Sequence, residues 1–245
     1  MFKVVYKYSA CIKIFTDDVI ILCDPWFNEA YYGTWTQQNK INNIEEFIGN
    51  FDIVYISHIH PDHYDPYTLD LLFKHYGEKK IIVADWGENA NYLEKKIKSD
   101  GFEKQLKVSN KSEYGNTIIN IIPNNTESIS DIDSAILVSS KITNKAVLNV
   151  NDCIYNKDHF KKIKILQEKL KINICLFCLG YTGAGPYPQT YFSPFLQKKL
   201  LEKKAQEKKN EFFERYKKAI KLINSEKRLP FAGKYLLQGD LSILN

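Results

Sequence analysis

Three of the five histidines in this chain of 245 residues fall within the segment His58-Ile59-His60-Pro61-Asp62-His63. Neutral imidazole nitrogens bind zinc and other first-row transition metals, and a carboxylate adds an oxygen ligand. His58 and His60 are two residues apart, so on an extended segment their side chains point to the same side. Asp62 and His63 follow a turn at the proline and face a neighbouring position. The segment therefore predicts two adjacent half-sites for metal, one before the proline and one after it.

An apolar run directly precedes this segment and is the element that must position it. Residues 53–56 are Ile-Val-Tyr-Ile, and a short run of β-branched and aromatic residues is typical of a buried strand. A strand that ends in a loop rich in ligands places those ligands at the edge of its sheet. The alternative is an ordinary polar loop that happens to be rich in histidine. The apolar strand, the spacing and the carboxylate together disfavour that alternative.

Short strands and helices alternate over most of the chain. Apolar runs predict further strands at 3–8, 10–15, 19–23, 80–84, 117–122, 135–139, 146–150 and 172–178, and helical spacing predicts helices at 66–77, 88–99 and 159–170. We expect the strand at 117–122 to end at Pro123. Two groups of strands with helices between them predict an α/β fold with two sheets and outer helices. No linker or internal repeat interrupts the chain, so we expect residues 1–245 to form one domain.

A long amphipathic pattern occupies about residues 194–224. Ser193 and Pro194 predict the N-cap and the first residue of a helix. Apolar residues then recur at helical spacing, at Leu201, Ala205, Phe212, Tyr216, Ala219, Ile220 and Ile223. The opposite face interleaves lysines with glutamates. It is either a basic surface for phosphates or the solvated face of an amphipathic helix, and the mixed charge favours the second interpretation.

Composition limits the class of protein. The chain is 44% hydrophobic and 13% aromatic, as expected of a globular protein, and its net charge of +5 permits an anionic ligand without requiring nucleic acid. We expect no signal peptide and no transmembrane span. The five cysteines are an odd number and favour a reducing, cytoplasmic setting. We expect Cys175 and Cys178, which lie in an apolar run, to be structural. The abundance of Lys, Ile and Asn favours a bacterial source.

The spacing H-x-H-x-D-H after a buried strand resembles the metal-binding motif of the metallo-β-lactamase superfamily. This resemblance implies a four-layer αββα sandwich and a later carboxylate that bridges two metal ions. Asp152, which follows a hydrophobic strand, is the best candidate for that carboxylate. One metal would then be held by His58, His60 and Asp152. The other would be held by Asp62, His63 and Asp152. The resemblance implies one or two divalent metal ions, with zinc favoured and manganese or iron as alternatives.

Further motifs give a closer resemblance over nearly the whole chain. In order, they are Cys23 to Phe27, Gly33 to Trp35, Asp133 to Ala135, Asn149 to Cys153, Gly183 to Pro188 and Pro230 to Gly233. This set is similar to the metallo-β-lactamase-type domain of CMP-N-acetylneuraminate hydroxylases. The early motifs are also similar to those of the L-ascorbate-6-phosphate lactonase branch.

Two departures from the family pattern bear on function. The hydroxylases have a separate Rieske iron–sulfur domain, and this sequence has no matching pair of Cys-His clusters. The superfamily supplies a third histidine between the loop and the bridging aspartate, but none lies between His75 and His159, and a last histidine near the C-terminus is also missing. We expect His75 to be a surface residue. An Asn or Glu oxygen within residues 123–127 could replace the third histidine and would favour a metal harder than zinc.

Three functions remain open at this point. The favoured one is a metal-dependent hydrolase in which a metal-bound water attacks a small anionic metabolite, such as a phosphorylated sugar, a lactone or a nucleotide sugar. Asp62 would orient the water or accept its proton. The second is an iron-dependent oxidative enzyme, or a component of one, with electrons from a separate protein. The third is a non-catalytic relative that binds a ligand. Candidate walls of a substrate pocket are Trp26, Trp35, Tyr181 and Tyr187, with core packing as the alternative for each.

Overall fold

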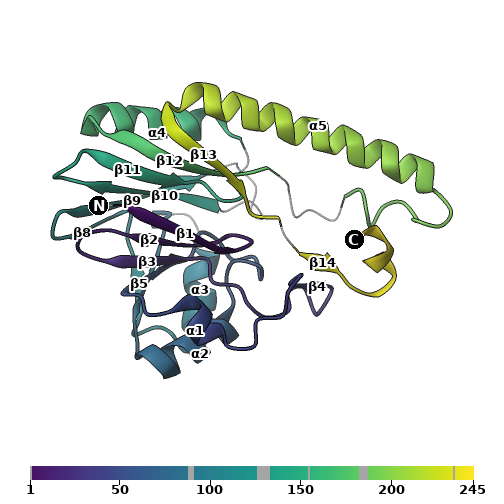
Figure 1. The fold of residues 1–245 in the computed structure, drawn as a ribbon, viewed down its shortest axis with the longest axis horizontal. Coiled ribbons are helices and arrows are strands. Elements are labelled where there is room, and N and C mark those ends of the chain that lie inside the picture. The colour runs from purple at the N-terminus through teal and green to yellow at the C-terminus, as the bar shows by residue number, and fades with distance from the viewer. Residues whose placement is uncertain (1, 88–90, 126–132, 154, 182–186, 234) are drawn as a thin grey trace.

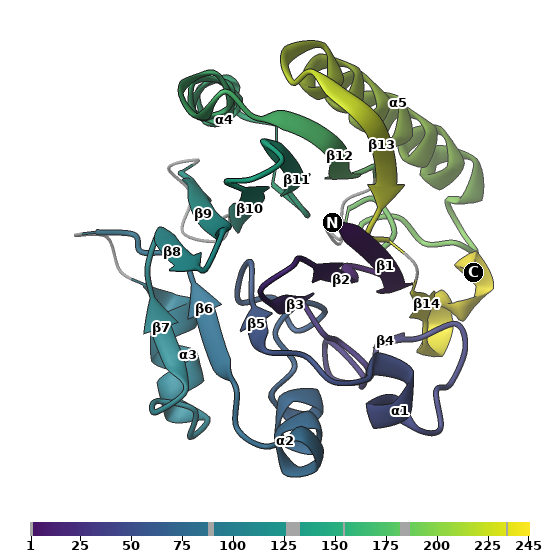
Figure 2. The same cartoon turned by 60° about the vertical axis from the view of Figure 1, so that its left-hand side comes forward.

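The computed structural model describes residues 2–87, 91–125, 133–153, 155–181, 187–233 and 235–245. Two six-stranded sheets pack face to face, and helices cover the outer face of each (Figures 1 and 2). This arrangement is the four-layer αββα sandwich that the sequence predicts. That the whole chain forms one domain stays a prediction.

The first sheet has the strand order β1-β2-β3-β5-β6-β7. Its strands are β1 (Lys3–Tyr8), β2 (Cys11–Phe15), β3 (Ile20–Cys23), β5 (Ile53–Tyr55), β6 (Lys80–Val83) and β7 (Leu106–Val108). The strands from β3 to β7 run parallel. Parallel neighbours end at the same edge of a sheet, and the backbone N–H of Asp24, after β3, donates to the carbonyl of Tyr55 at 3.0 Å. The segment after β3 therefore lies beside the histidine loop after β5.

The second sheet has the order β13-β12-β11-β10-β9-β8. Its strands are β8 (Lys111–Tyr114), β9 (Thr117–Asn124), β10 (Asp133–Ser140), β11 (Lys145–Asn149), β12 (Asn173–Gly180) and β13 (Ser225–Phe231). The prediction that β9 ends before Pro123 is wrong, because Pro123 pairs with Ser134 of β10. On its other side β9 pairs with β8 from Thr117 to Asn120. No strand among the described residues pairs with that side of β9 at Pro123, and a sheet tolerates proline at such an unpaired position.

Among the described residues, helices α1–α5 form the outer layers (Figure 1). The first sheet is covered by α1 (Ile44–Ile48), α2 (Pro66–Tyr76) and α3 (Tyr92–Ser99), and the second by α4 (Lys157–Leu170) and α5 (Lys198–Leu222). Buried apolar side chains form three clusters: one beneath α1–α3, one between the sheets, and one beneath α4 and α5. Each layer boundary thus has its own core, so both faces of both sheets are apolar. The predicted start of α3 at residue 88 falls outside the described residues.

The helix α5 begins later than predicted. Ser193 is not its N-cap: the Ser193 hydroxyl accepts hydrogen bonds from the backbone of Phe195 and Leu196, and this turn precedes a helix that starts at Lys198. In its C-terminal part, Ala219 packs into the core beneath the helix, as does Ile223 at its C-cap. The N-terminal part extends past the edge of the second sheet (Figure 1).

The chain ends in a short segment that returns to the first sheet's side of the molecule (Figure 2). Strand β14 (Leu236–Leu237) pairs with β4 (Trp35–Thr36), and the 3₁₀ helix η1 (Gly239–Leu244) follows. This pairing stacks Tyr235 on Trp35, with ring centroids 3.8 Å apart and planes 3° from parallel. All five cysteines are free thiols. Among the described residues no helix is long and apolar enough to cross a membrane.

Candidate metal centre

The histidine loop is fixed at its start by the segment that follows β3. Asp24 is fully buried, and its carboxylate accepts hydrogen bonds from the backbone N–H of Ser57 at 2.8 Å and from the Ser57 hydroxyl at 2.7 Å. The carbonyl of His60 then accepts hydrogen bonds from the backbone of His63 and Tyr64. This turn brings the side chain of His63 back toward that of His58.

Asp65 fixes the end of the loop. Its Oδ1 caps α2 by accepting from the backbone of Tyr67 and Thr68. Its Oδ2 accepts from the Thr68 hydroxyl at 2.6 Å and from the backbone of Phe27 and Asn28. One buried carboxylate thus joins the helix that follows the loop to the segment that follows β3.

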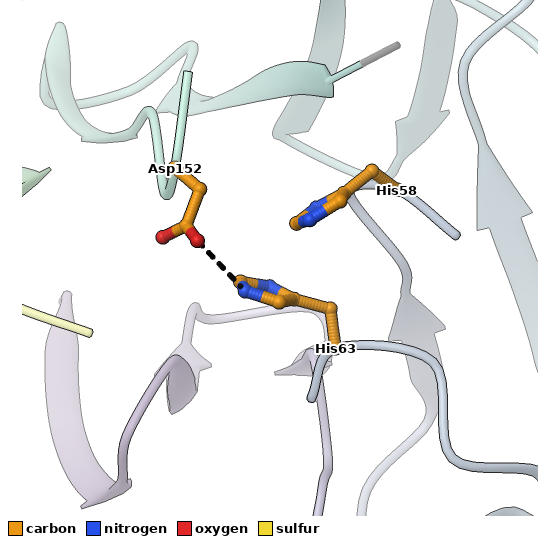
Figure 3. Close-up of side chains that lie close together, drawn as sticks. All are labelled: His58, His63 and Asp152. Carbon is orange, nitrogen blue, oxygen red and sulfur yellow. Dashed lines mark ion pairs between the residues drawn. The ribbon is translucent and has the colours of Figure 1, made fainter. Parts of the chain in front are cut away.

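His58, His63 and Asp152 converge at the edge where both sheets end. Each offers a ligand atom, and these atoms all lie within 4.8 Å of one another (Figure 3). His63 Nε2 lies 3.3 Å from Asp152 Oδ2. The two histidines are 2% and 1% exposed, so this is a buried arrangement of donors and not a surface cluster. The two histidines follow β5 in one sheet, and Asp152 follows β11 in the other.

Asp152 reaches the site because its loop is tied to β12. The backbone of Val150 donates to Cys178 at 3.0 Å, and Gly180 donates to the carbonyl of Asn151 at 3.1 Å. A Cβ atom at Gly180 would lie 2.8 Å from that carbonyl oxygen. Glycine therefore permits an approach between strand and loop that any larger residue would widen.

The other two predicted ligands lie in the same cluster. His60 Nδ1 is 2.8 Å from His58 Nε2, and Asp62 Oδ2 is 3.6 Å from His63 Nε2. Asp62 also accepts a hydrogen bond from the Tyr31 hydroxyl at 3.0 Å. The structure thus brings all five predicted residues together, but its tightest group joins His58 with His63 across the two predicted half-sites. Which of the five coordinate metal stays a prediction.

Two carboxylates that the sequence interpretation did not assign stand behind the histidines. Asp24 Oδ2 lies 2.9 Å from His63 Nδ1, within hydrogen-bond distance. The hydrogen-bond partner of His58 Nδ1 is the Ser57 hydroxyl at 2.9 Å, and Asp133 Oδ1 lies farther away, 3.6 Å from that nitrogen. A carboxylate on the second ring nitrogen is the usual partner of a metal-binding histidine, because it fixes the ring and its tautomer. The available signal for Asp24 was its place directly after the strand that neighbours β5. We call His58, His63, Asp152, Asp24 and Asp62 the metal cradle.

Three side chains of the metal cradle, those of His63, His58 and Asp62, have shifted pKa values. Burial lowers the pKa of His63, but the nearby carboxylates of Asp152, Asp62 and Asp24 outweigh it and hold that pKa well above its usual range. Burial and the neighbouring His63 and His60 lower the pKa of His58. Burial also raises the pKa of Asp62. Buried carboxylates are stabilised by a cation, so the imidazole and carboxylate donors present here fit a divalent metal ion.

A small cavity of about 10 Å³ borders the metal cradle. Asp62, His63, Asp152 and Tyr235 are among its lining residues. Its volume is close to that of one water-sized sphere. The space is therefore sufficient for a single small occupant beside the carboxylates.

The predicted pocket residues differ in their placement. Trp26 is 1% exposed and lies in the core beneath the first sheet. Trp35 is 7% exposed and lies between Tyr31, which binds Asp62, and Tyr235. Tyr181 and Tyr187 line a larger groove along α5. These side chains were proposed as substrate contacts, and that role stays a prediction.

Other sequence predictions can be placed as well. His75 is exposed on α2, as expected of a surface residue. Of the segment suggested to replace the third histidine, Asn124 is fully buried and pairs with Asp133 across β9 and β10. Thr126 and Glu127 lie outside the described residues, as do residues 183–186 of the glycine-rich motif.

Comparison with known families decides the assignment of the fold. The sequence model of the Beta-lactamase superfamily domain matches residues 3–127, just over half of the chain, including Asp24 and the histidine loop. The chain belongs to this superfamily.

Curated relatives match larger or smaller parts of the chain. A protein of Mycolicibacterium smegmatis, provisionally named a Rieske 2Fe-2S iron–sulfur protein, is 28% identical over 182 residues, which cover 71% of this chain and 33% of the relative. Cytidine monophosphate-N-acetylneuraminic acid hydroxylase of Asterias rubens is 32% identical over 85 residues, 34% of this chain and 13% of the relative. The chain thus spans about a third or less of these relatives.

Solved structures share the fold at low sequence identity. CmlA, a diiron β-hydroxylase from Streptomyces venezuelae, aligns with a TM-score of 0.65 at 14% identity, over 94% of this chain and 44% of its own. An isothiocyanate hydrolase from Delia radicum gut bacteria aligns with a TM-score of 0.52 at 15% identity, over 72% and 70% of the two chains. Similar folds therefore occur in proteins named as hydrolases and as oxidative enzymes.

Proposed function

We propose that this protein is a metal-dependent hydrolase whose metal cradle activates water against a small anionic substrate. The observation that carries the proposal is the convergence of His58, His63 and Asp152 from two sheets, with carboxylates behind both histidines. When bound, a divalent metal ion supplies a Lewis acid and a source of hydroxide at neutral pH. Zinc is the metal we expect, and the five free thiols support a cytoplasmic setting.

The residues of the metal cradle have three different roles in this proposal: metal binding, orientation of a histidine and proton transfer. His58, His63 and Asp152 would hold the metal. Asp24 keeps the Nδ1–H of His63 occupied, so that Nε2 faces Asp62 and Asp152. Asp62 is the general base in this proposal: burial raises its pKa, and the Tyr31 hydroxyl orients it by donating a hydrogen bond to Oδ1.

Elemental analysis of the purified protein tests the site. We expect one or two equivalents of divalent metal, and a loss of at least tenfold in metal content in Asp152→Ala. Asp158→Ala, at an exposed aspartate of α4, is the matched control and should retain metal. Full metal content in Asp152→Ala contradicts the ligand assignment. Metal below a few per cent after supplementation, with unchanged folding, favours a non-catalytic binding protein.

Hydrolysis is tested separately with lactone, phosphodiester and nucleotide-sugar substrates. We expect turnover with at least one class by metal-loaded protein and its loss in Asp62→Asn, which removes the proposed base while keeping its shape. Failure of the metal-loaded protein on all three classes contradicts the hydrolase proposal.

An oxidative enzyme is the second candidate, and sequence similarity to the Asterias rubens hydroxylase favours it. In this proposal the metal is iron and a separate protein supplies electrons. Iron in anaerobically purified protein, with oxygen consumption that depends on an added reductant, would support this candidate. A colourless protein that contains only zinc would contradict it.

A further inference from the structure

A second, larger cavity runs along the N-terminal part of α5. We call this groove of about 550 Å³ the α5 groove. Its walls come from α5, from the segment 187–194 and from the C-terminal segment. Most of the lining side chains are apolar, including Leu201 and Phe212 of α5 and Ile243 and Leu244 of η1. This volume lies within the range of sites for small organic molecules.

The α5 groove lies next to the metal cradle. Tyr235 lines both the groove and the small cavity beside Asp62 and Asp152. Its ring is held by stacking on Trp35. The two cavities therefore share a wall at Tyr235.

The groove also carries a surplus of positive charge. Lys198, Lys208 and Lys209 line it, against one carboxylate from Glu202. The ammonium of Lys208 lies over two aromatic rings, 5.7 Å from that of Tyr187 and 5.9 Å from that of Phe212. The same ammonium donates a hydrogen bond to the carbonyl of Tyr187. A lysine ammonium has three N–H donors, so those of Lys208 that remain are available to an anionic group of a ligand.

Apolar side chains along the groove remain exposed to solvent. Phe213 is 45% exposed, Ile243 is 59% exposed, and Leu244 is 39% exposed. Burial of aliphatic and aromatic surface at these positions would stabilise a complex. The groove thus offers both an apolar wall and a cation.

We propose that the α5 groove is the substrate-binding site and that its ligand is a small amphiphilic anion. The aliphatic or aromatic body would lie against Leu201 and Phe212, and a carboxylate or phosphate would pair with Lys208. The link to catalysis rests on the proposed hydrolase function, but binding in the groove does not. Among small anions, the α5 groove thus favours those with an apolar body over those that resemble sugars.

Titration calorimetry on the full, metal-loaded chain tests the ligand class. The probes are decanoate and decyl phosphate, which separate the two anionic groups, with decanol as the neutral analogue and glucose 6-phosphate as the polar one. We expect one equivalent of at least one amphiphilic anion to bind, at least tenfold more tightly than decanol or glucose 6-phosphate. Tighter binding of glucose 6-phosphate overturns the proposal.

Matched variants locate the binding. Ala205→Trp fills the groove and should weaken the probe at least tenfold, whereas Gln206→Trp, on a neighbouring exposed position outside the lining, should not. Lys208→Met removes the charge but keeps the stem and should cost about threefold to tenfold, with Lys203→Met as its control. The proposal is overturned if, in each pair, the groove variant and its control weaken probe binding to the same extent. Light scattering is run in parallel, and a dimer that Ala205→Trp abolishes would show that a second copy occupies the groove.

The same titration on Asp152→Ala separates this inference from the proposed function. We expect that variant to lose metal and to bind the probe within about threefold of the parent, because Asp152 does not line the groove. Probe binding without hydrolysis would leave the groove assignment standing while the hydrolase proposal fails. Hydrolysis that Ala205→Trp leaves unaffected would support the hydrolase proposal and overturn the groove assignment.

Discussion

The metal cradle and the α5 groove share Tyr235 but are built in different ways. Every residue of the metal cradle except Asp152 is at least 95% buried, and each of its side chains has a hydrogen-bond or ion-pair partner at a defined distance. The α5 groove is lined by partly exposed apolar side chains such as Phe213 and Ile243. The difference indicates that the metal cradle fixes geometry in advance, whereas the groove supplies area for a ligand of variable shape.

Removal of the carboxylate that anchors the histidine loop should have the largest effect on stability. Asp65→Ala leaves the hydrogen-bond donors on both sides of the loop unsatisfied and should lower the free energy of unfolding by about 3 kcal/mol. The control, Asn43→Ala, removes the N-cap of the more exposed α1 and should cost about 1 kcal/mol. Urea denaturation measures both. Equal costs would show that the loop is not held as described.

Removal of a cradle carboxylate should weaken metal binding. Asp24→Asn keeps the shape of the side chain but replaces the acceptor that faces His63 Nδ1, and we expect a loss of 10- to 100-fold in metal affinity. Competition with a chelating dye measures the affinity. Asp158→Asn, at an exposed aspartate, serves as control. An Asp24→Asn protein with the parent's affinity would exclude Asp24 from the metal cradle.

A buried histidine outside the metal cradle separates the effect of burial from that of carboxylates. His159 is 2% exposed, and its Nε2 lies 3.0 Å from the carbonyl of Ile122. Burial lowers its pKa from 6.5 to about 4, whereas the carboxylates raise that of the equally buried His63. Below pH 6.5 the unfolded chain therefore binds a proton at this position that the folded chain does not bind until about pH 4.

Stability should consequently fall as the pH drops from 6.5 to 4. The contribution of His159 between pH 7 and pH 5 is about 2 kcal/mol, and His159→Gln should remove it. Urea denaturation at several pH values compares this variant with the parent and with His75→Gln, at an exposed histidine that should leave the pH dependence unchanged. A parent-like pH dependence in His159→Gln would contradict the assignment.

The smallest effect is expected in the groove. Phe213→Ser removes an exposed aromatic ring and should change the free energy of unfolding by no more than about 0.5 kcal/mol. Thermal denaturation without ligand measures this. A larger loss would mean that Phe213 of α5 is part of the packed structure, and the contrast with the metal cradle would weaken.

The two regions also differ in how much the sequence reveals. His58, His60, Asp62 and His63 lie in one short segment after an apolar strand, so local pattern was sufficient to find them. Asp24 was not assigned a role, because its contact with His63 depends on β3 and β5 being parallel neighbours. The grouping of His58 with His63 depends on the turn at His60, which spacing alone does not define.

The same distinction applies to the fold. Runs of apolar residues located most strands and helices of the sandwich. Pro123 was taken as the end of β9, because the sequence does not show that β8 stops pairing before that residue. Of the groove's lining, Tyr181 and Tyr187 were predicted as pocket walls. The contribution of the C-terminal segment was not predicted, because its position depends on the pairing of β14 with β4.

The C-terminal segment, of which residues 231–233 and 235–245 are described, borders both cavities, while the metal-cradle residues come from loops of the two sheets. Substitutions in this segment would change the walls of both cavities. They would not change the residues of the metal cradle. The residues that would hold the metal and those that would contact the ligand are thus encoded in separate stretches of the sequence.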